Sequence, residues 1–222
     1  MKQLNCYIDH TLLKATATKL DIIELCDEAK RFKFYSVCVN SSYVSTAKDQ
    51  LKNSNVKICS VVGFPLGAMT TQAKVFEAQN ALKDGADEID MVMNIGLLKS
   101  KDFDAVKNDI KAVKQIMPNN ILKVILETCY LDASEIVKAC ELAIQAEADF
   151  IKTSTGFGSG GARIEDVELM LKVAASSKVK IKVSGGIRDT QTALDYINLG
   201  VDRLGTSSGI AIVSGTKPIS NY

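Results

Sequence analysis

Short β-branched runs alternate with longer amphipathic stretches along the whole chain. In the amphipathic stretches, apolar residues recur at spacings of three and four, which is typical of helices with one buried face. The β-branched runs between them predict strands. Eight strands are predicted, over residues 6–9, 35–39, 57–62, 88–93, 122–126, 150–154, 180–184 and 203–206.

The clearest helix pattern covers residues 131–148. Asp132 can cap its first turn, Glu135 completes a capping box, and apolar residues follow at helical spacing. Gly85 and Gly200 stand just past two other predicted helices, where a left-handed residue is favoured. Well-bounded helices therefore separate the predicted strands.

Strict alternation of strands and helices predicts a parallel sheet that is covered by helices. Eight strands in 222 residues favour a small closed (βα)8 barrel, the TIM barrel, over an open doubly wound sheet. The first strand has the weakest pattern of the eight. We expect a single TIM-barrel domain over residues 1–222, with a flexible polar tail over residues 216–222.

Composition and charge exclude several classes of function. The chain has 27 Lys and Arg against 26 Asp and Glu, for a net charge of +1, so no basic excess favours nucleic acid or an anionic membrane. It has no run of eighteen apolar residues and no apolar signal core, which predicts a cytoplasmic protein. The six cysteines form no CxxC pair and are predicted to be free, mostly buried thiols. His10 is the only histidine, which rules out a three-histidine zinc site.

A faint internal repeat relates three segments that each follow a helix and enter a strand. Residues 85–90, 147–152 and 200–205 share this pattern, which gives Asp90 and Lys152 equivalent strand positions. Alternate strands of a barrel supply the same interior layer. The repeat therefore predicts that Asp90 and Lys152 point inward at one height, unless it reflects only a common helix-to-strand turn.

Two lysines on neighbouring strands are expected inside the barrel. Lys152 and Lys182 alternate with Ile151 and Ile181, so lysines face inward if isoleucines face the helices. The alternatives are that Lys152 extends to water at the mouth and that Lys182 lies on the wet face of an edge strand. Two ammonium groups ~5 Å apart repel by roughly 3 kcal/mol at an effective dielectric of ~20, which favours one neutral, nucleophilic amine. With Asp90 available for proton transfer, this layout suits a Schiff-base enzyme.

Two glycine-containing turns predict a phosphate site. Gly185 and Gly186 follow the seventh strand, and residues 205–209 follow the eighth and open a short helix. Backbone amides at these turns and the helix N-terminus suit a phosphate at the mouth of a barrel, although either turn alone is more often only a tight turn. Residues 156–161 match GxGxxG, but the next strand lacks the acidic residue of a dinucleotide site. We interpret this stretch as a loop over the mouth.

Eight segments in order resemble the deoxyribose-phosphate aldolase family, which are class I aldolases. Each segment alone is weak, and the combination carries the resemblance. The segments are IDHTLLK (8–14), VCVN (37–40), VVGFPLG (61–67), EIDMVMNIG (88–96), LKVILET (122–128), FIKTSTGFG (150–158), IKVSGGIRD (181–189) and RLGTSSG (203–209).

The resemblance implies a role for each candidate residue. Lys152 would form the Schiff base, Lys182 would be the neighbouring lysine that activates it, and Asp90 would belong to the proton relay. Some relatives carry a phosphate-binding lysine after the TSTG segment, but Phe157 stands there in this chain. The residues that match the phosphate-binding turns are Gly185, Gly186, Gly205, Ser207 and Ser208.

The implied reaction is reversible cleavage of 2-deoxy-D-ribose 5-phosphate to acetaldehyde and glyceraldehyde 3-phosphate, in the breakdown of deoxyribose phosphate. The resemblance implies no metal and no organic cofactor. The expected partner is a small phosphosugar, and a homodimer is compatible with the sequence. Two alternatives stay open: another lysine-imine barrel, such as a transaldolase-like enzyme, and a non-catalytic phosphosugar-binding barrel.

The C-terminal tail offers one more candidate. Its six or seven residues could span up to ~20 Å when extended, which is enough to reach over the mouth. The phenol of Tyr222 is therefore a candidate for relaying a proton. The alternative is a disordered terminus without a role.

Overall fold

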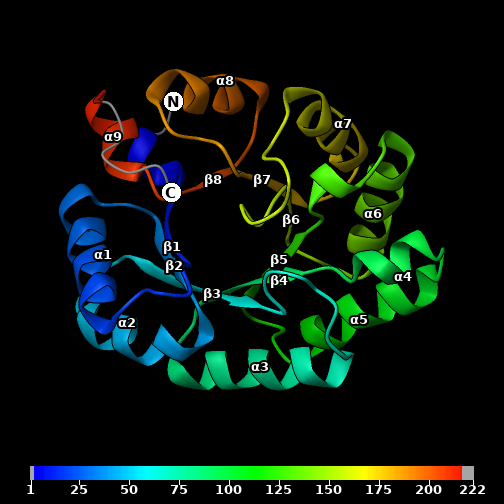
Figure 1. Ribbon diagram of the computed structural model, residues 1–222, viewed down its shortest axis with the longest axis horizontal. Coiled ribbons are helices and arrows are strands. Elements are labelled where there is room, and N and C mark those ends of the chain that lie inside the picture. The colour runs from blue at the N-terminus through cyan, green and yellow to red at the C-terminus, as the bar shows by residue number, and fades with distance from the viewer. Residues whose placement is uncertain (1–2, 217–222) are drawn as a thin grey trace.

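Eight parallel strands close into a barrel in which each strand pairs with the next in chain order and β1 pairs with β8. The computed structural model describes residues 3–216, and Figure 1 shows the helices as a ring around the strands. This architecture confirms the predicted TIM barrel. The strands are β1 (Ile8–Leu12), β2 (Ser36–Val39), β3 (Lys57–Val62), β4 (Glu88–Val92), β5 (Ile121–Ile125), β6 (Phe150–Lys152), β7 (Lys180–Ser184) and β8 (Arg203–Thr206).

The helices lie in the connections between successive strands and after the last one. Short 3-10 turns occur at η1 (Leu4–Tyr7), η2 (Ser41–Tyr43) and η3 (Thr128–Tyr130). No helix within residues 3–216 combines the length and apolar character that a membrane crossing needs. The α-helices are α1 (Lys19–Phe32), α2 (Val44–Gln50), α3 (Thr71–Asp84), α4 (Ile95–Lys99), α5 (Phe103–Gln115), α6 (Ala133–Gln145), α7 (Ile164–Ala174), α8 (Thr190–Leu199) and α9 (Gly209–Ser214).

The predicted bounds of the first strand were wrong. Residues 4–7 form η1, in which the Cys6 amide donates to the Gln3 carbonyl at 3.0 Å, so β1 starts at Ile8. It then runs on to Leu12, which pairs with Val39 of β2. The strand is therefore set by pairing with its neighbours on both sides, which its own short pattern does not reveal.

The helix ends follow the predicted capping residues. Asp132 and Glu135 form a reciprocal capping box at the start of α6, although the helix itself is shorter than the predicted stretch. Gly85 and Gly200 end α3 and α8 in the left-handed region, at φ 110° and 105°. These caps fix where each helix stops and the next strand begins.

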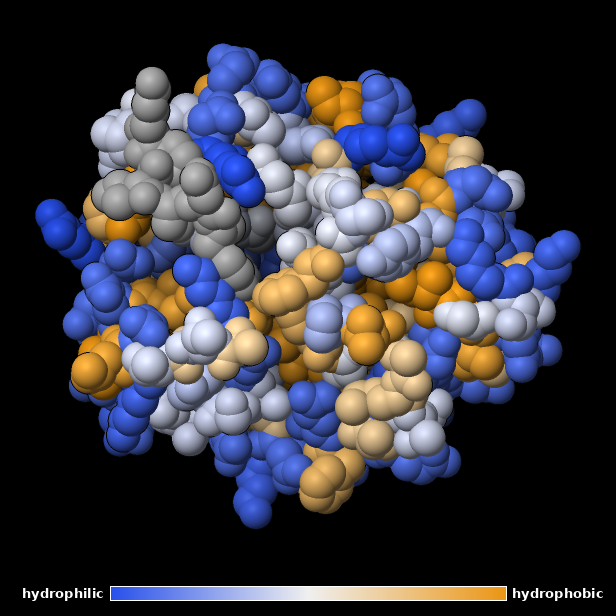
Figure 2. Space-filling view, in the orientation of Figure 1, coloured by the Kyte–Doolittle hydropathy of each residue, from blue (hydrophilic) through white to orange (hydrophobic). Residues whose placement is uncertain are grey.

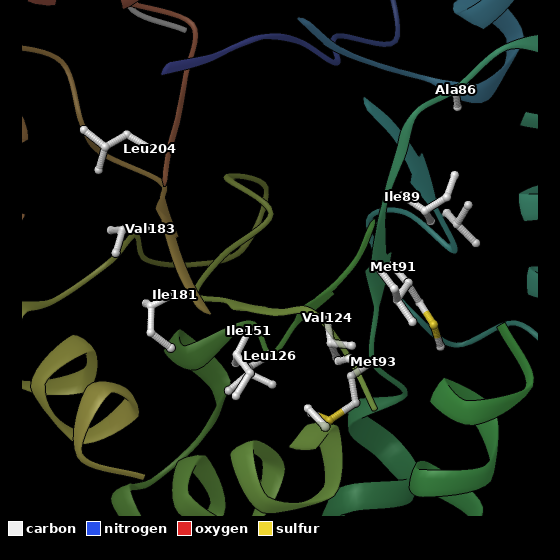
Figure 3. Close-up of a cluster of buried hydrophobic side chains, with 14 of the residues drawn as sticks. Ala86, Ile89, Met91, Met93, Val124, Leu126, Ile151, Ile181, Val183 and Leu204 are labelled. Carbon is white, nitrogen blue, oxygen red and sulfur yellow. The ribbon is translucent and has the colours of Figure 1, made fainter. Parts of the chain in front are cut away.

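The strands bury apolar side chains on their outer face. Ile151, Ile181 and Val183 are at most 1% exposed, and Figure 3 shows Ile151 and Ile181 on the side of their strands that faces the surrounding helices. Because side chains alternate along a strand, Lys152 and Lys182 lie on the opposite, inner face. The apolar layer between strands and helices thus determines which residues the barrel encloses.

Strand pairing brings the predicted residues to one height. Lys152 pairs with Lys182 across β6 and β7. Asp90 pairs with Lys123, whereas Lys152 pairs with Ile125, two residues further along β5. That stagger of one residue per strand is the shear of an eight-stranded barrel. The tilt of the strands compensates for it, and the Asp90 and Lys152 side chains meet in the interior.

Candidate active site

Charged side chains fill the barrel interior. They come from six of the eight strands, and each is at most 3% exposed. Charges at this depth are tolerated only when they are paired and hydrogen-bonded. The residues are Asp9, Glu88, Asp90, Lys123, Lys152, Lys182 and Arg203.

Asp90 is the centre of this network. Its Oδ2 accepts hydrogen bonds from Lys152 Nζ at 2.8 Å and Lys182 Nζ at 2.7 Å. By the sum of these two distances, the two nitrogens lie within about 5.5 Å of each other. Its Oδ1 accepts from Lys123 Nζ at 2.8 Å. Burial alone would raise the pKa of Asp90, but the three ammonium groups outweigh it and hold that pKa well below the usual range.

Lys182 is held as a cation. Its Nζ lies 2.5 Å from Asp9 Oδ2 and 2.7 Å from Asp90 Oδ2. Burial favours the neutral amine, but the carboxylates of Asp9 and Asp90 outweigh it and raise the pKa of Lys182. Lys152 therefore has a fixed positive charge as its neighbour.

Lys123 and Arg203 complete the network around Lys152 and Lys182. Lys123 Nζ bridges Glu88, at 2.5 Å, and Asp90, while Arg203 bridges Glu88 and Asp9. Sequence reasoning missed Lys123. The signal was present, because Lys123 stands between apolar residues in a strand, in the same pattern that pointed to Lys152.

Lys152 differs from the other three cations in two ways. Lys123, Lys182 and Arg203 each contact two carboxylates, whereas Asp90 is the one carboxylate of the described residues that Lys152 contacts. Among residues 3–216, four cations face three carboxylates in the interior, so one positive charge has no matching negative charge there. Lys152 is the least compensated of the four and, among them, the one that lines the cavity at the mouth.

The cavity at the mouth has a volume of about 140 Å³ and carries several of the predicted phosphate-site residues. Ser208 is not in its lining, and the Ser208 amide donates to Thr206 Oγ1 at 2.9 Å. Asp90 and Lys182 are fully buried and are not in the lining. The predicted residues in the lining are Lys152, Gly185, Gly186, Gly205 and Ser207.

Two further side chains at the cavity were not assigned a role from the sequence. Arg188 follows the glycine pair of the β7–α8 turn, lines the cavity and is exposed. Phe157, in the loop between β6 and α7, also lines the cavity. Its ring meets that of Phe64 edge-on, with the ring centroids 5.3 Å apart. Figure 2 shows apolar side chains near the centre of this face. The mouth therefore combines an aromatic pair with a cation beside the glycine turns.

Glu127 holds the loop between β6 and α7. It is buried, in the left-handed region at φ 55°, and its carboxylate accepts from both the backbone amide and the hydroxyl of Thr155. The loop that continues from Lys152 is thus tied to the end of β5. Sequence reasoning missed this residue, because the contact joins positions 28 apart in the chain.

His10 occupies a structural position. Its Nε2 lies 2.6 Å from Glu28 Oε2, and its ring packs on Phe34 at a centroid distance of 4.9 Å. It is not in the lining of the cavity that contains Lys152. Tyr222 and the tail beyond Thr216 lie outside the described residues.

The closed barrel and its interior lysine beside a glycine-lined cavity define the class of barrel enzymes that react through a lysine imine. Within this class, the chain belongs to the DeoC/LacD family of aldolases, whose model matches residues 4–214. The predicted resemblance, the fold and the assignment to the lyases are thereby confirmed.

Curated relatives match over nearly their whole length. The deoxyribose-phosphate aldolase of Finegoldia magna is 57% identical over 213 residues, covering 96% of this chain and 100% of the relative. That of Thermococcus kodakarensis is 57% identical over 218 residues, covering 96% and 97%. Among solved structures, the deoxyribose phosphate aldolase of Aeropyrum pernix superposes with a TM-score of 0.89 at 31% identity, covering 95% of this chain and 89% of the other.

Proposed function

We propose that this chain reversibly cleaves 2-deoxy-D-ribose 5-phosphate to acetaldehyde and D-glyceraldehyde 3-phosphate through a Schiff base on Lys152. The observation that carries the proposal is the placement of Lys152 Nζ at the floor of the cavity, 2.8 Å from a carboxylate oxygen that also binds Lys182. The names of the relatives support the substrate. The role in the cell would be the breakdown of deoxyribose phosphate.

The first step is imine formation. The neutral amine of Lys152 attacks C1 of the open-chain sugar, and water leaves after the hydroxyl oxygen of the carbinolamine gains a proton. Lys182, a cation that shares Asp90 Oδ2 with Lys152, is placed to supply that proton, and Asp90 conducts protons between the two nitrogens. The product is a protonated imine on Lys152.

The second step breaks the C2–C3 bond, because acetaldehyde retains C1 and C2. The C3 hydroxyl loses its proton, the bonding electrons move toward the iminium nitrogen, and glyceraldehyde 3-phosphate leaves with an enamine remaining on Lys152. Protonation of the enamine at C2 and hydrolysis then release acetaldehyde. The imine is the electron sink throughout, so the reaction needs neither a metal nor an organic cofactor.

The substrate phosphate would bind at the turns after β7 and β8. Gly185, Gly186, Gly205 and Ser207 line that side of the cavity, where backbone amides and a hydroxyl can donate to phosphate oxygens. Arg188 lines the same side and supplies a positive charge that glycines and serines lack. We assign Ser208 to the support of this turn, because its amide is bonded to Thr206.

Borohydride trapping tests the nucleophile. Acetaldehyde and borohydride together should leave an ethyl group on Lys152, located by peptide mass spectrometry, and a Lys152→Met variant should take up no label at the site. Borohydride without aldehyde is the control. An ethyl group on another lysine, or none in an active enzyme, would contradict the assignment.

Two substrate tests separate the remaining alternatives. A transaldolase-like enzyme would transfer a three-carbon ketone donor, whereas this chain is expected to use acetaldehyde as donor. A non-catalytic phosphosugar-binding barrel would bind the sugar phosphate without forming a reducible imine. The non-catalytic barrel gives no reason for Lys152 and Lys182 to share one carboxylate oxygen.

Association into a homodimer is the assembly that we propose. Three apolar side chains on α3 and the loop before it are exposed: Leu66 by 75%, Phe76 by 65% and Met69 by 41%. Burial of such a group against a second copy would remove it from water. Light scattering coupled to size-exclusion chromatography should give twice the chain mass for the wild type and a lower mass for Phe76→Glu. A monomeric wild type would refute the proposal.

A further inference from the structure

Two cysteine thiols lie side by side in the barrel interior, next to the catalytic carboxylate. Cys38 of β2 and Cys59 of β3 are register partners, and both are fully buried. Their Sγ atoms and a carboxylate oxygen of Asp90 all lie within 4.8 Å of one another. Cys59 Sγ donates to Asp90 Oδ1 at 3.1 Å. The proposed reaction uses neither thiol.

We propose that Cys38, Cys59 and Asp90 form a binding site for a thiophilic divalent cation, Zn²⁺ or Cd²⁺, and that its occupation inhibits the lyase reaction. Two thiolates and a carboxylate suit such ions. At a Zn–S distance of about 2.3 Å, tetrahedral coordination places two sulfurs about 3.8 Å apart. The three donors are therefore within about 1 Å of the spacing that one ion requires.

Charge balance does not oppose the exchange. When a dication binds two thiolates, two thiol protons leave, so the total charge of the interior does not change. Lys123 Nζ lies 3.3 Å from Cys59 Sγ, and the neighbouring ammonium groups of Lys152 and Lys182 already face Asp90. The network thus accepts the ion without any added positive charge.

Inhibition follows because Asp90 would serve two roles that exclude each other. The ion would draw the carboxylate toward the thiols and away from the nitrogens of Lys152 and Lys182, which depend on it for position and for proton transfer. Only the two thiol protons are lost, and no sulfur is oxidised. A chelator should therefore restore activity, which distinguishes metal binding from thiol oxidation.

The active-site cavity supplies the route to the thiols. Cys38 and Cys59 pack with Leu13, Val61 and Phe64, and Leu13 also lines the cavity that contains Lys152. An ion must pass these apolar side chains, so we expect binding to be slow and inhibition to develop with time. Substrate in the cavity should slow it further.

Cadmium titration of the chelator-treated enzyme tests the site. We expect one Cd²⁺ per chain, a thiolate-to-cadmium charge-transfer band in the ultraviolet, and a loss of activity that parallels the band and is reversed by chelator. In Cys38→Ser and Cys59→Ser, where a hydroxyl preserves size and hydrogen bonding, the concentration for half inhibition should rise at least tenfold. The matched control is Cys140→Ser. Cys140 is buried in α6, outside the barrel interior, and this variant should behave as wild type.

X-ray absorption of the Zn²⁺-loaded wild type gives a second measure that requires no variant. Two sulfur neighbours at about 2.3 Å are expected. Fewer sulfur neighbours, or cadmium inhibition that is unchanged in both Cys38→Ser and Cys59→Ser, would overturn the proposal. Loss of the effect in Cys6→Ser or Cys129→Ser would overturn it as well, by assigning the ion to another thiol. Activity without added metal is measured separately, so these outcomes leave the proposed lyase function untouched.

Discussion

Lys152 owes its position to strand alternation and its chemistry to its neighbours. Apolar residues on the outer face of β6 turn it inward, where it meets Asp90 and a lysine that two carboxylates keep protonated. At the scale of single side chains, the proposed nucleophile differs from the other interior lysines in having one carboxylate partner where they have two.

Replacement of Lys182 tests this pair. In Lys182→Leu the cation that shares Asp90 Oδ2 with Lys152 is gone, and with it the proposed proton donor for imine formation. We expect activity near pH 7 to fall by roughly 10²-fold or more. Lys180→Leu, an exposed lysine on the same strand, is the control. A folded Lys182→Leu variant with the activity of the wild type would show that the two lysines are not coupled.

Arg188 is expected to set the preference for phosphorylated substrate. In Arg188→Gln the side chain loses its charge but keeps its polarity, so KM for 2-deoxyribose 5-phosphate should rise about tenfold or more, as when a charge-assisted hydrogen bond of 1.5–3 kcal/mol is lost. Cleavage of unphosphorylated 2-deoxyribose should be almost unchanged. The measurement is steady-state kinetics on both sugars. An equal loss of kcat/KM on both would show that Arg188 does not bind the phosphate.

At the scale of elements, the β6–α7 loop is fixed by the end of the preceding strand. Glu127 follows β5 in the left-handed region and binds the amide and hydroxyl of Thr155, three residues after Lys152. A non-glycine residue in this region costs of order 1 kcal/mol or more. The two hydrogen bonds to a charged acceptor offset that cost and restrain the loop that carries Phe157.

Weakening this contact should affect the loop before it affects the barrel. Glu127→Gln removes the charge but preserves size, so the Thr155 amide should exchange with deuterium faster while β5 and β6 keep their protection. We expect a rise in KM for the sugar phosphate with a smaller change in kcat. Hydrogen-exchange mass spectrometry of residues 153–163 is the measurement, and a loop as protected as in the wild type would rule out the role.

At the scale of the whole molecule, the interior network couples stability to pH. Burial opposes ionisation of Asp9 and Asp90, but the cations around them outweigh it and lower both pKa values. The stability contributed by such carboxylates is fully present above their unfolded pKa, near 3.9, and is lost as pH falls through the lowered folded value. The network joins β1, β4, β5, β6, β7 and β8, so its loss weakens the closed barrel as a unit.

Acid unfolding should reveal this coupling. From pH 7 down to about 5 we expect these two carboxyls to leave the urea midpoint unchanged. Below about pH 4 the free energy of unfolding should fall by up to about 2.7 kcal/mol per pH unit, the linkage slope for two groups. Asp9→Asn, although less stable at pH 7, should show a shallower decline. An identical slope in that variant would contradict the pKa of Asp9 as a source of acid sensitivity.

The sequence by itself determined the fold and the inward lysines. Alternating strand and helix patterns are local, and so are the caps at Asp132, Gly85 and Gly200, which is why the element order and the barrel followed from them. The pair Lys152 and Lys182 followed from period-two alternation, which assigns each residue to a face without reference to its partners. Where the signal was too short, as in β1, pairing with neighbouring strands set the bounds instead.

Only the tertiary structure decided which charges meet. Barrel closure and its stagger bring Asp9, Lys123 and Arg203 into contact with the residues around Asp90, across as many as 194 positions of chain. The same closure sets Cys38 beside Cys59 and Glu127 beside Thr155. Contact distances, burial and the balance of cations and carboxylates depend on all eight strands at once. The pattern of residues along the chain therefore does not predict them. The electrostatics that distinguish Lys152 from its neighbours are therefore a property of the closed barrel.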